Sequence, residues 1–381
     1  MRRLRIGVVN TNFTLGGVEK VSITLAQLLH DLFTYDVILI DFLGIHPFAY
    51  QVDKSIKVMT NQYRRTFLEK VVALMGQKKY QFTKKPYSIA KGSKSRIKGL
   101  ANLIKEQNLE VVIMSQGYLT ALIPALKKLL PTVKFVAWQH TTYEIYMKQD
   151  NLAFLPEYVA GLEAADVVVS LTKADSGKFK KHNPTSVGIY NPVLIGNIDN
   201  KVTNLNNKTL LYVGRLDYYG KGIDLLLEIM VHLPSDWKLL LVGDGSDEAI
   251  IKNKIQELEL KEKVILAGFA DEKKLATYYV QSDILLSTSR WEGFGLTILE
   301  AMTFGLPVVA FDNGGPKEIL DNGEYGVLVE KENIKMFQKE LENLIKSREL
   351  REVYQKKSLE RMKKFDTCVI MKEWKLLLNK L

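Results

Sequence analysis

The sequence predicts an α/β protein built from two doubly wound domains that face a central cleft. Short apolar runs alternate with amphipathic stretches along the chain, the pattern of strand–helix–strand units with parallel sheets. An asparagine-rich stretch, residues 191–207, has little periodicity and interrupts this alternation, so we interpret it as a linker. The length of 381 residues suits two domains better than one core.

Each domain has its own series of expected elements. The first domain, residues 1–190, should hold strands at 5–10, 35–39, 110–114, 134–138 and 166–171, with a helix at about 18–30. The second domain, residues 208–355, should hold strands at 209–213, 238–242, 264–267, 284–286, 307–310 and 326–329. Its helices are expected at 223–233, 248–258, 272–281 and 295–304. Residues 356–381 predict a C-terminal helix that packs back on the first domain.

Cysteine content and hydropathy indicate the compartment. The single cysteine, Cys368, can form no internal disulfide, which favours a reducing cytoplasm. The apolar run Ile6–Val9 is too short for a signal peptide, and no run approaches the roughly 20 apolar residues of a spanning helix. We therefore expect a cytoplasmic protein that neither is exported nor crosses a bilayer.

Most of the excess positive charge lies in one segment, residues 54–98. It carries 13 Lys and Arg against one acid, Glu69, within a chain of net charge +10. Apolar side chains are interleaved with the cations, and Arg65–Gly76 has helical apolar spacing, as in helices that lie on anionic membranes. The alternative is a flexible solvated insertion. No nucleic-acid recognition motif accompanies the charge, so we expect no nucleic-acid partner.

Three glycine-containing loops follow predicted strands, where parallel sheets bind ligands. The first contains Gly16 and Gly17 just before a helix, whose N-terminus suits a phosphate. A simple strand-to-helix turn is the alternative for this loop.

The second loop, residues 213–222, places Arg215 and Lys221 among glycines. A guanidinium fork and an ammonium point charge together suit a diphosphate. Gly222 stands where a Walker loop needs a hydroxyl side chain, which disfavours Mg²⁺-ATP. Two solvated cations on a surface loop are the alternative.

The third segment, residues 290–302, carries Glu292 before a predicted helix and Glu300 within it. Its glycines bring the first N–H groups of the helix close to a ligand, again favouring phosphate. A carboxylate accepts two hydroxyl hydrogen bonds at once, as the diols of ribose or hexose require. We expect Phe294 to offer an apolar surface beside the sugar.

These loops, together with residues 307–319, resemble family four of the retaining glycosyltransferases, which have the GT-B fold of two Rossmann-like domains. The resemblance covers Leu211–Val329. It reaches the first half through Gly16-Gly17, His140 and the Tyr190-Asn191-Pro192 turn.

The resemblance implies a role for each matching position. Arg215 and Lys221 would hold the donor diphosphate and stabilise the departing nucleotide. Glu300 would bind the ribose hydroxyls, and Glu292 would contact the transferred sugar near its reacting centre. The backbone of Gly293, Phe294, Gly295 and Leu296 would cap the distal phosphate.

Further positions would complete the donor site. Gly268 and Phe269 would meet the nucleobase, and Gly16 and Gly17 would complete the phosphate cradle from the first domain. His140 follows the strand 134–138 and would contact the sugar as a catalytic residue, with a structural histidine as the alternative.

The sequence predicts no cofactor and no essential metal. No Asp-x-Asp pair occurs, and the histidines lack metal-ligand spacing. Two cations and a helix N-terminus would instead neutralise the diphosphate.

The function implied is transfer of a hexose or N-acetylhexosamine from a nucleotide diphosphate sugar, with UDP as the default. The acceptor would be a saccharide, lipid-linked, in capsule, exopolysaccharide or cell-wall glycan synthesis at the inner face of the cell membrane. A nucleotide-sugar 2-epimerase of the same fold and a non-catalytic sugar-nucleotide-binding protein are the alternatives.

Overall fold

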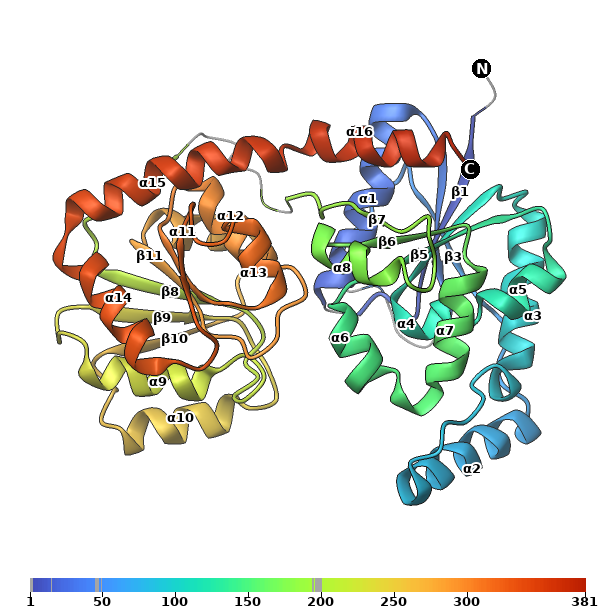
Figure 1. The fold of residues 1–381 in the computed structure, drawn as a ribbon, viewed down its shortest axis with the longest axis horizontal. Coiled ribbons are helices and arrows are strands. Elements are labelled where there is room, and N and C mark those ends of the chain that lie inside the picture. The colour runs from blue at the N-terminus through green and yellow to red at the C-terminus, as the bar shows by residue number, and fades with distance from the viewer. Residues whose placement is uncertain (1–2, 15, 45–47, 49, 194, 196–200) are drawn as a thin grey trace. The chain divides into compact units, whose positions relative to one another are not determined.

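The computed structural model describes residues 3–14, 16–44, 48, 50–193, 195 and 201–381. It divides into two compact units, residues 1–192 with 367–381 and residues 193–366 (Figure 1). Each unit is a parallel sheet with helices on both faces, as the alternating pattern predicts.

The first unit is a seven-stranded sheet of order β3-β2-β1-β4-β5-β6-β7, in which every pair is parallel. Its strands are β1 (Arg5–Asn10), β2 (Asp36–Asp41), β3 (Lys57–Thr60), β4 (Val111–Ser115), β5 (Lys134–Trp138), β6 (Val167–Ser170) and β7 (Val187–Gly188). Its helices are α1 (Gly17–Phe33), α2 (Phe67–Thr83), α3 (Lys94–Glu106), α4 (Gln116–Thr120), α5 (Ile123–Leu129), α6 (Tyr143–Ile145), α7 (Leu155–Ala164), α8 (Lys173–Phe179) and α16 (Thr367–Leu378). Short β3 and β7 are absent from the sequence prediction because both are edge strands with little apolar content.

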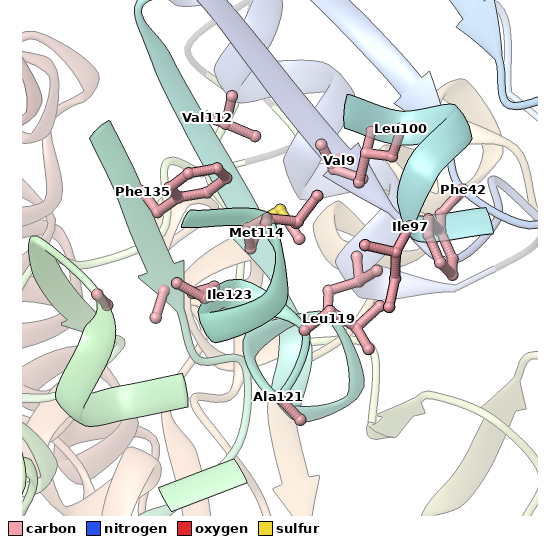
Figure 2. Packing of buried hydrophobic residues seen from close by; sticks show 14 of the residues in the cluster. Val9, Phe42, Ile97, Leu100, Val112, Met114, Leu119, Ala121, Ile123 and Phe135 are labelled. Atoms are coloured by element: carbon pink, nitrogen blue, oxygen red, sulfur yellow. The ribbon is translucent and has the colours of Figure 1, made fainter. Parts of the chain in front are cut away.

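Central strands of this sheet are buried on both faces. Val112 and Met114 of β4 pack in one cluster with Val9 of β1 and with side chains of α3, α4, α5 and the turn between α4 and α5 (Figure 2). Strands covered on both sides require near-continuous apolar runs, which is why β4 and β5 are the easiest strands to predict.

The second unit is a six-stranded parallel sheet of order β10-β9-β8-β11-β12-β13. Its strands are β8 (Thr209–Val213), β9 (Lys238–Val242), β10 (Val264–Gly268), β11 (Ile284–Ser287), β12 (Val308–Phe311) and β13 (Val327–Val329). Its helices are α9 (Ile223–His232), α10 (Glu248–Glu257), α11 (Glu272–Val280), α12 (Leu296–Thr303), α13 (Gly314–Ile319), α14 (Ile334–Lys346) and α15 (Arg348–Met362). The order reverses between β8 and β11, the switch point where doubly wound sheets bind ligands.

The boundaries of the units differ from the sequence expectation at both ends of the second unit. Residues 201–207 of the expected linker belong to it, since Thr203 donates to the carbonyl of Ser282 and Asn207 N–H donates to the Asp283 carboxylate. The C-terminal helix expected over 356–381 is two helices. The first, α15, stays on the second unit, where Arg361 donates to the carbonyl of Ile319.

Residues 367–381 form the part of the tail that belongs to the first unit. Helix α16 buries Trp374 against Trp138 of β5, with ring centroids 5.3 Å apart in an edge-to-face arrangement. Across the described residues, no helix is long and apolar enough to cross a membrane.

Candidate active site

The loop between β8 and α9 is folded back tightly onto the end of β11. Gly222 precedes α9 with a φ of +64°, and a Cβ on it would lie 1.9 Å from the Thr288 carbonyl oxygen. Only glycine fits this position, and the close approach brings the loop of β8 next to the loop of β11.

The two cations of this loop have different surroundings. The side chain of Arg215 is exposed and forms no ion pair within the described part of the chain, while its carbonyl accepts the Tyr212 hydroxyl at 2.9 Å. Lys221 Nζ lies 2.7 Å from Glu292 Oε2, with both side chains partly buried. The structure thus brings Lys221 and Glu292, 71 residues apart, into one ion pair, a contact that the sequence does not reveal.

The segment after β11 leads into α12 through Gly295, whose φ of +102° is left-handed. Phe294 corrects one expectation. Its side chain is only 2% exposed and packs edge-on against Phe365, so it offers no apolar surface to a sugar. The sequence-based placement fails because an aromatic residue between two glycines can point either way. The backbone from Gly293 to Leu296 is the part of this segment that remains a candidate for phosphate binding.

Glu300 lies on α12 and is 5% exposed. Its Oε2 accepts a hydrogen bond of 2.8 Å from the hydroxyl of Tyr279, which is fully buried on α11. Burial, and then the charge of Glu300, raise the pKa of Tyr279 well above its usual value, so the hydroxyl stays protonated and donates. Tyr279 therefore orients the carboxylate that the resemblance assigns to the ribose.

We expect Tyr279→Phe to lower the free energy of unfolding by about 1–2 kcal/mol, because a buried carboxylate loses a donor. Urea denaturation of the full chain measures this, and Tyr278→Phe at the next residue is the matched control. Equal stability of Tyr279→Phe and the parent would contradict the role of this hydrogen bond.

Arg290 is a residue whose role the sequence analysis missed. Its guanidinium makes two parallel hydrogen bonds with Asp224, at 2.8 and 2.7 Å, and a third of 2.6 Å to the Tyr219 carbonyl. It also pairs with Glu332 and lies over the Tyr219 ring at 3.9 Å. Arg290 thereby ties the loop that carries Lys221 to the loop that carries Glu292. Its partners are distant in sequence, so only the fold reveals the contact.

The residues expected near a nucleobase lie at the carboxyl end of β10, with Gly268 as its last residue and Phe269 directly after it. Gly268 has a φ of +69°, and the space that a side chain at this position would enter is open. Phe269 is 58% exposed. An exposed aromatic ring at the carboxyl end of a strand can stack on a base, so Phe269 stays a candidate for that role.

The first unit holds the glycine pair at the start of α1. Gly16 N–H donates to the Tyr50 hydroxyl at 3.1 Å, and that hydroxyl donates back to the Gly16 carbonyl. Gly17 is exposed at the first position of α1, and the N-terminus of a helix favours an anion. Tyr50 is a second contact that sequence spacing does not indicate.

His140 follows β5 and packs on Trp138, with ring centroids 4.2 Å apart. Burial lowers the pKa of His140 to about 3, so the imidazole is neutral at physiological pH. Its Nε2 has no hydrogen-bond partner among the described residues, nor has Nε1 of Trp138. Buried polar atoms are normally paired, so His140 stays a candidate for binding a saccharide hydroxyl rather than for proton transfer as a cation.

The described residues contain no group of three His, Cys, Asp or Glu side chains arranged to hold a metal ion. The loops of the second unit carry groups that suit an anion and hydroxyl groups. Arg215, Lys221 and the helix N-terminus at Gly295 supply positive potential, and Glu292 and Glu300 supply acceptors for hydroxyl groups.

Comparisons with known proteins identify the family of the chain. The model of the family "Glycosyl transferases group 1" matches residues 197–361. An uncharacterized glycosyltransferase of Haemophilus influenzae is 32% identical over 98% of this chain and 99% of its own. A Campylobacter jejuni N-acetylgalactosamine-N,N'-diacetylbacillosaminyl-diphospho-undecaprenol 4-alpha-N-acetylgalactosaminyltransferase is 32% identical over 60% of this chain and 65% of its own. Among solved structures, Anabaena HepE with UDP and glucose superposes with a TM-score of 0.77 at 17% identity, over all of both chains.

Two parallel Rossmann-like domains with these structural neighbours define a GT-B glycosyltransferase fold. The chain belongs to the group 1 family of glycosyl transferases.

Proposed function

We propose that this enzyme transfers a hexose or N-acetylhexosamine from a UDP-sugar, with retention of anomeric configuration, to a lipid-linked saccharide. The observation that carries the proposal is the Lys221–Glu292 ion pair at the sheet's switch point, with the exposed Arg215 in the same loop as Lys221. The UDP found with Anabaena HepE and the diphospho-undecaprenol acceptor in the name of the Campylobacter relative support the choice of donor and acceptor.

The chemistry follows from where charge develops. The bond from the anomeric carbon to the diphosphate oxygen breaks, and negative charge grows on the leaving UDP. Arg215 and Lys221 stabilise that charge, with the N–H groups at the start of α12. The acceptor hydroxyl attacks the same face of the sugar and gives its proton to the leaving phosphate. Glu292 positions the sugar hydroxyls, and Glu300 binds the ribose. The cations supply the neutralisation that a metal would otherwise give, so we propose a metal-independent reaction without a cofactor.

The test is incubation with UDP-glucose, UDP-N-acetylglucosamine or UDP-N-acetylgalactosamine and a lipid-diphosphate-linked saccharide, with and without EDTA. We expect a product that keeps the anomeric configuration of the donor sugar, as read by NMR coupling constants, at a rate unaffected by EDTA. An inverted product would refute retention. Epimerised donor without transfer would favour the epimerase alternative.

We further propose that the chain works in the cytoplasm at the inner face of the cell membrane, in capsule, exopolysaccharide or cell-wall glycan synthesis, with α2 as the membrane contact. Figure 1 places α2 at the periphery of the first unit. Its inner side approaches the unit through small residues, with Ala73 against Gly92 and Gly76 against Tyr87. Its outer side exposes large apolar side chains among lysines: Phe67, Leu68, Val72, Leu74, Met75 and Phe82. Apolar and basic side chains together suit an anionic lipid surface.

Replacing Phe67, Leu68 and Phe82 together by serine should lower binding to vesicles containing phosphatidylglycerol at least about a hundredfold, because each buried apolar side chain contributes about 1.5–3 kcal/mol. Sedimentation with vesicles measures the partition. Ile250→Ser, which removes an exposed apolar side chain of α10, is the control and should bind as the parent does. Undiminished binding of the triple variant would refute the role of α2.

A further inference from the structure

Three arginines gather past the carboxyl ends of β2, β3 and β4. Arg64 and Arg65 follow β3, and Arg96 lies in the first turn of α3. Arg64 donates to the carbonyls of Leu43 and Gly44, just after β2, and Arg65 reaches Tyr118 of α4, which follows β4. Ligands of parallel sheets bind at this edge, so the cluster lies where a binding site is expected.

Arg65 has neutral partners. Its Nη2 donates to Ser93 Oγ at 3.0 Å and to the Tyr118 hydroxyl at 3.3 Å, and these two hydroxyl oxygens lie 3.1 Å apart. Its Nε is buried and has no hydrogen-bond partner among the described residues. Among the described residues this half-buried guanidinium is held by hydroxyl groups and no carboxylate, and a charge without a counter-charge is costly to bury.

Arg96 also has a buried guanidinium nitrogen without a hydrogen-bond partner among the described residues. That nitrogen is Nε. Arg96 does form a hydrogen bond through its backbone carbonyl, which accepts from Asn61 Nδ2 at 2.9 Å. Burial, and then the positive charge of Arg65, lower the pKa of Arg96. The two guanidinium groups repel each other, so holding Arg65 and Arg96 close together lowers the stability of the folded protein.

The nearby acids are engaged elsewhere. Asp41, whose charge partly offsets that of Arg96, accepts the N–H groups of Leu43 and Gly44 at 3.0 and 2.7 Å. Glu69 is the one acid of residues 54–98. Its carboxylate accepts hydrogen bonds from the N–H group of Thr66, which caps α2, and from the N–H group of Ser95 in α3. Within the described residues, none of the three arginines forms an ion pair with a carboxylate.

We propose that Arg65 and Arg96, with the hydroxyls of Ser93 and Tyr118, bind a diphosphate, and that this diphosphate is the one joining the acceptor saccharide to its lipid. An anion with several oxygens accepts hydrogen bonds from both guanidinium groups and offsets their repulsion. Helix α2 begins two residues after Arg65, so the apolar side chains proposed to meet lipid start beside the cations. This assignment rests on the proposed lipid-linked acceptor and adds the residues that recognise it.

The first test is binding of inorganic pyrophosphate to the full chain, by calorimetry with UDP at saturation so that the nucleotide site is occupied. Arg65→Gln and Arg96→Gln should each weaken pyrophosphate binding about tenfold or more, the effect of one charged hydrogen bond. Lys105→Gln removes an exposed charge from the far end of α3 and should bind as the parent does. Unchanged pyrophosphate affinity in both arginine variants would overturn the assignment, as would equal loss of UDP binding, since the substitutions would then act through the fold.

The second test separates the acceptor's diphosphate from a free anion. Arg65→Gln should raise the KM for a lipid-diphosphate-linked saccharide about tenfold. It should leave the KM for the same saccharide as a non-ionic glycoside unchanged, and Arg65→Lys should recover part of the loss. An equal change with both acceptors would overturn the role in acceptor recognition. Failure of the parent to bind UDP would contradict the proposed donor, whereas the loss of pyrophosphate affinity on replacing Arg65 or Arg96 would still test this assignment.

Discussion

Lys221→Gln and Glu292→Gln are each expected to lower kcat/KM about 10²–10³-fold, the usual effect of removing one preorganised charge from a transition state. In the proposed mechanism Lys221 opposes the charge on the leaving diphosphate, and Glu292, 2.7 Å from the lysine, also holds the sugar. Each substitution therefore removes a direct contact with the donor and also releases its partner. Initial rates with a UDP-sugar measure the effect.

The double variant distinguishes a shared role from two separate ones. If the two side chains act as a unit, the double variant loses little more than either single one, because residues that act together are not additive. Lys252→Gln is the control, since it breaks an exposed Lys–Glu pair on α10 and should leave the rate unchanged. Full additivity of the two losses would contradict the joint role.

Arg290→Met should destabilise the second unit by roughly 3 kcal/mol, because it leaves the partly buried Asp224 carboxylate without its cation. A loss of this size corresponds to a fall in Tm of about 6–12 °C for a unit of this length. The same change frees the Tyr219 carbonyl, two residues before Lys221, so kcat/KM should fall beyond the loss of folded protein. Calorimetry and rates at a temperature where the variant is folded measure the two effects separately.

Arg348→Met is the matched control for Arg290→Met. Arg348 pairs with Glu352 one turn away on α15, and both side chains are half-exposed. Exposed pairs of this kind contribute at most about 0.5 kcal/mol, so the control should melt within about 2 °C of the parent. Similar losses in the two variants would contradict the role of Arg290 as a tie between loops.

The sequence predicts the sheets better than the site. Strands such as β4 and β8 carry short apolar runs that are typical of strands buried on both faces. The sequence predicts the bounds of these strands to within a residue or two. Edge strands β3 and β7 lack that signal, and the tail divides at residue 366 because α15 and α16 pack on different units. Local patterning cannot show on which unit an amphipathic helix packs.

The sequence predicts which loops carry the site residues, but not which of these residues contact one another. Glycines and charges mark the loops after β8 and β11, yet the pairing of Lys221 with Glu292 depends on adjacent strands that are distant in sequence. The same holds for Arg290 with Asp224 and for Tyr279 with Glu300. Phe294 was assigned to the wrong environment because its neighbours give no sign of which way it points.

The most direct test of the donor site is a calorimetric titration of UDP and of uridine against the parent and Arg215→Gln. Arg215 is exposed and has no ion pair within the described residues, so its replacement should leave the fold unchanged. If Arg215 binds the diphosphate, the affinity for UDP should fall about tenfold or more in the variant, while the affinity for uridine stays the same. Equal affinity of parent and variant for UDP would contradict the assignment of the donor diphosphate to this loop.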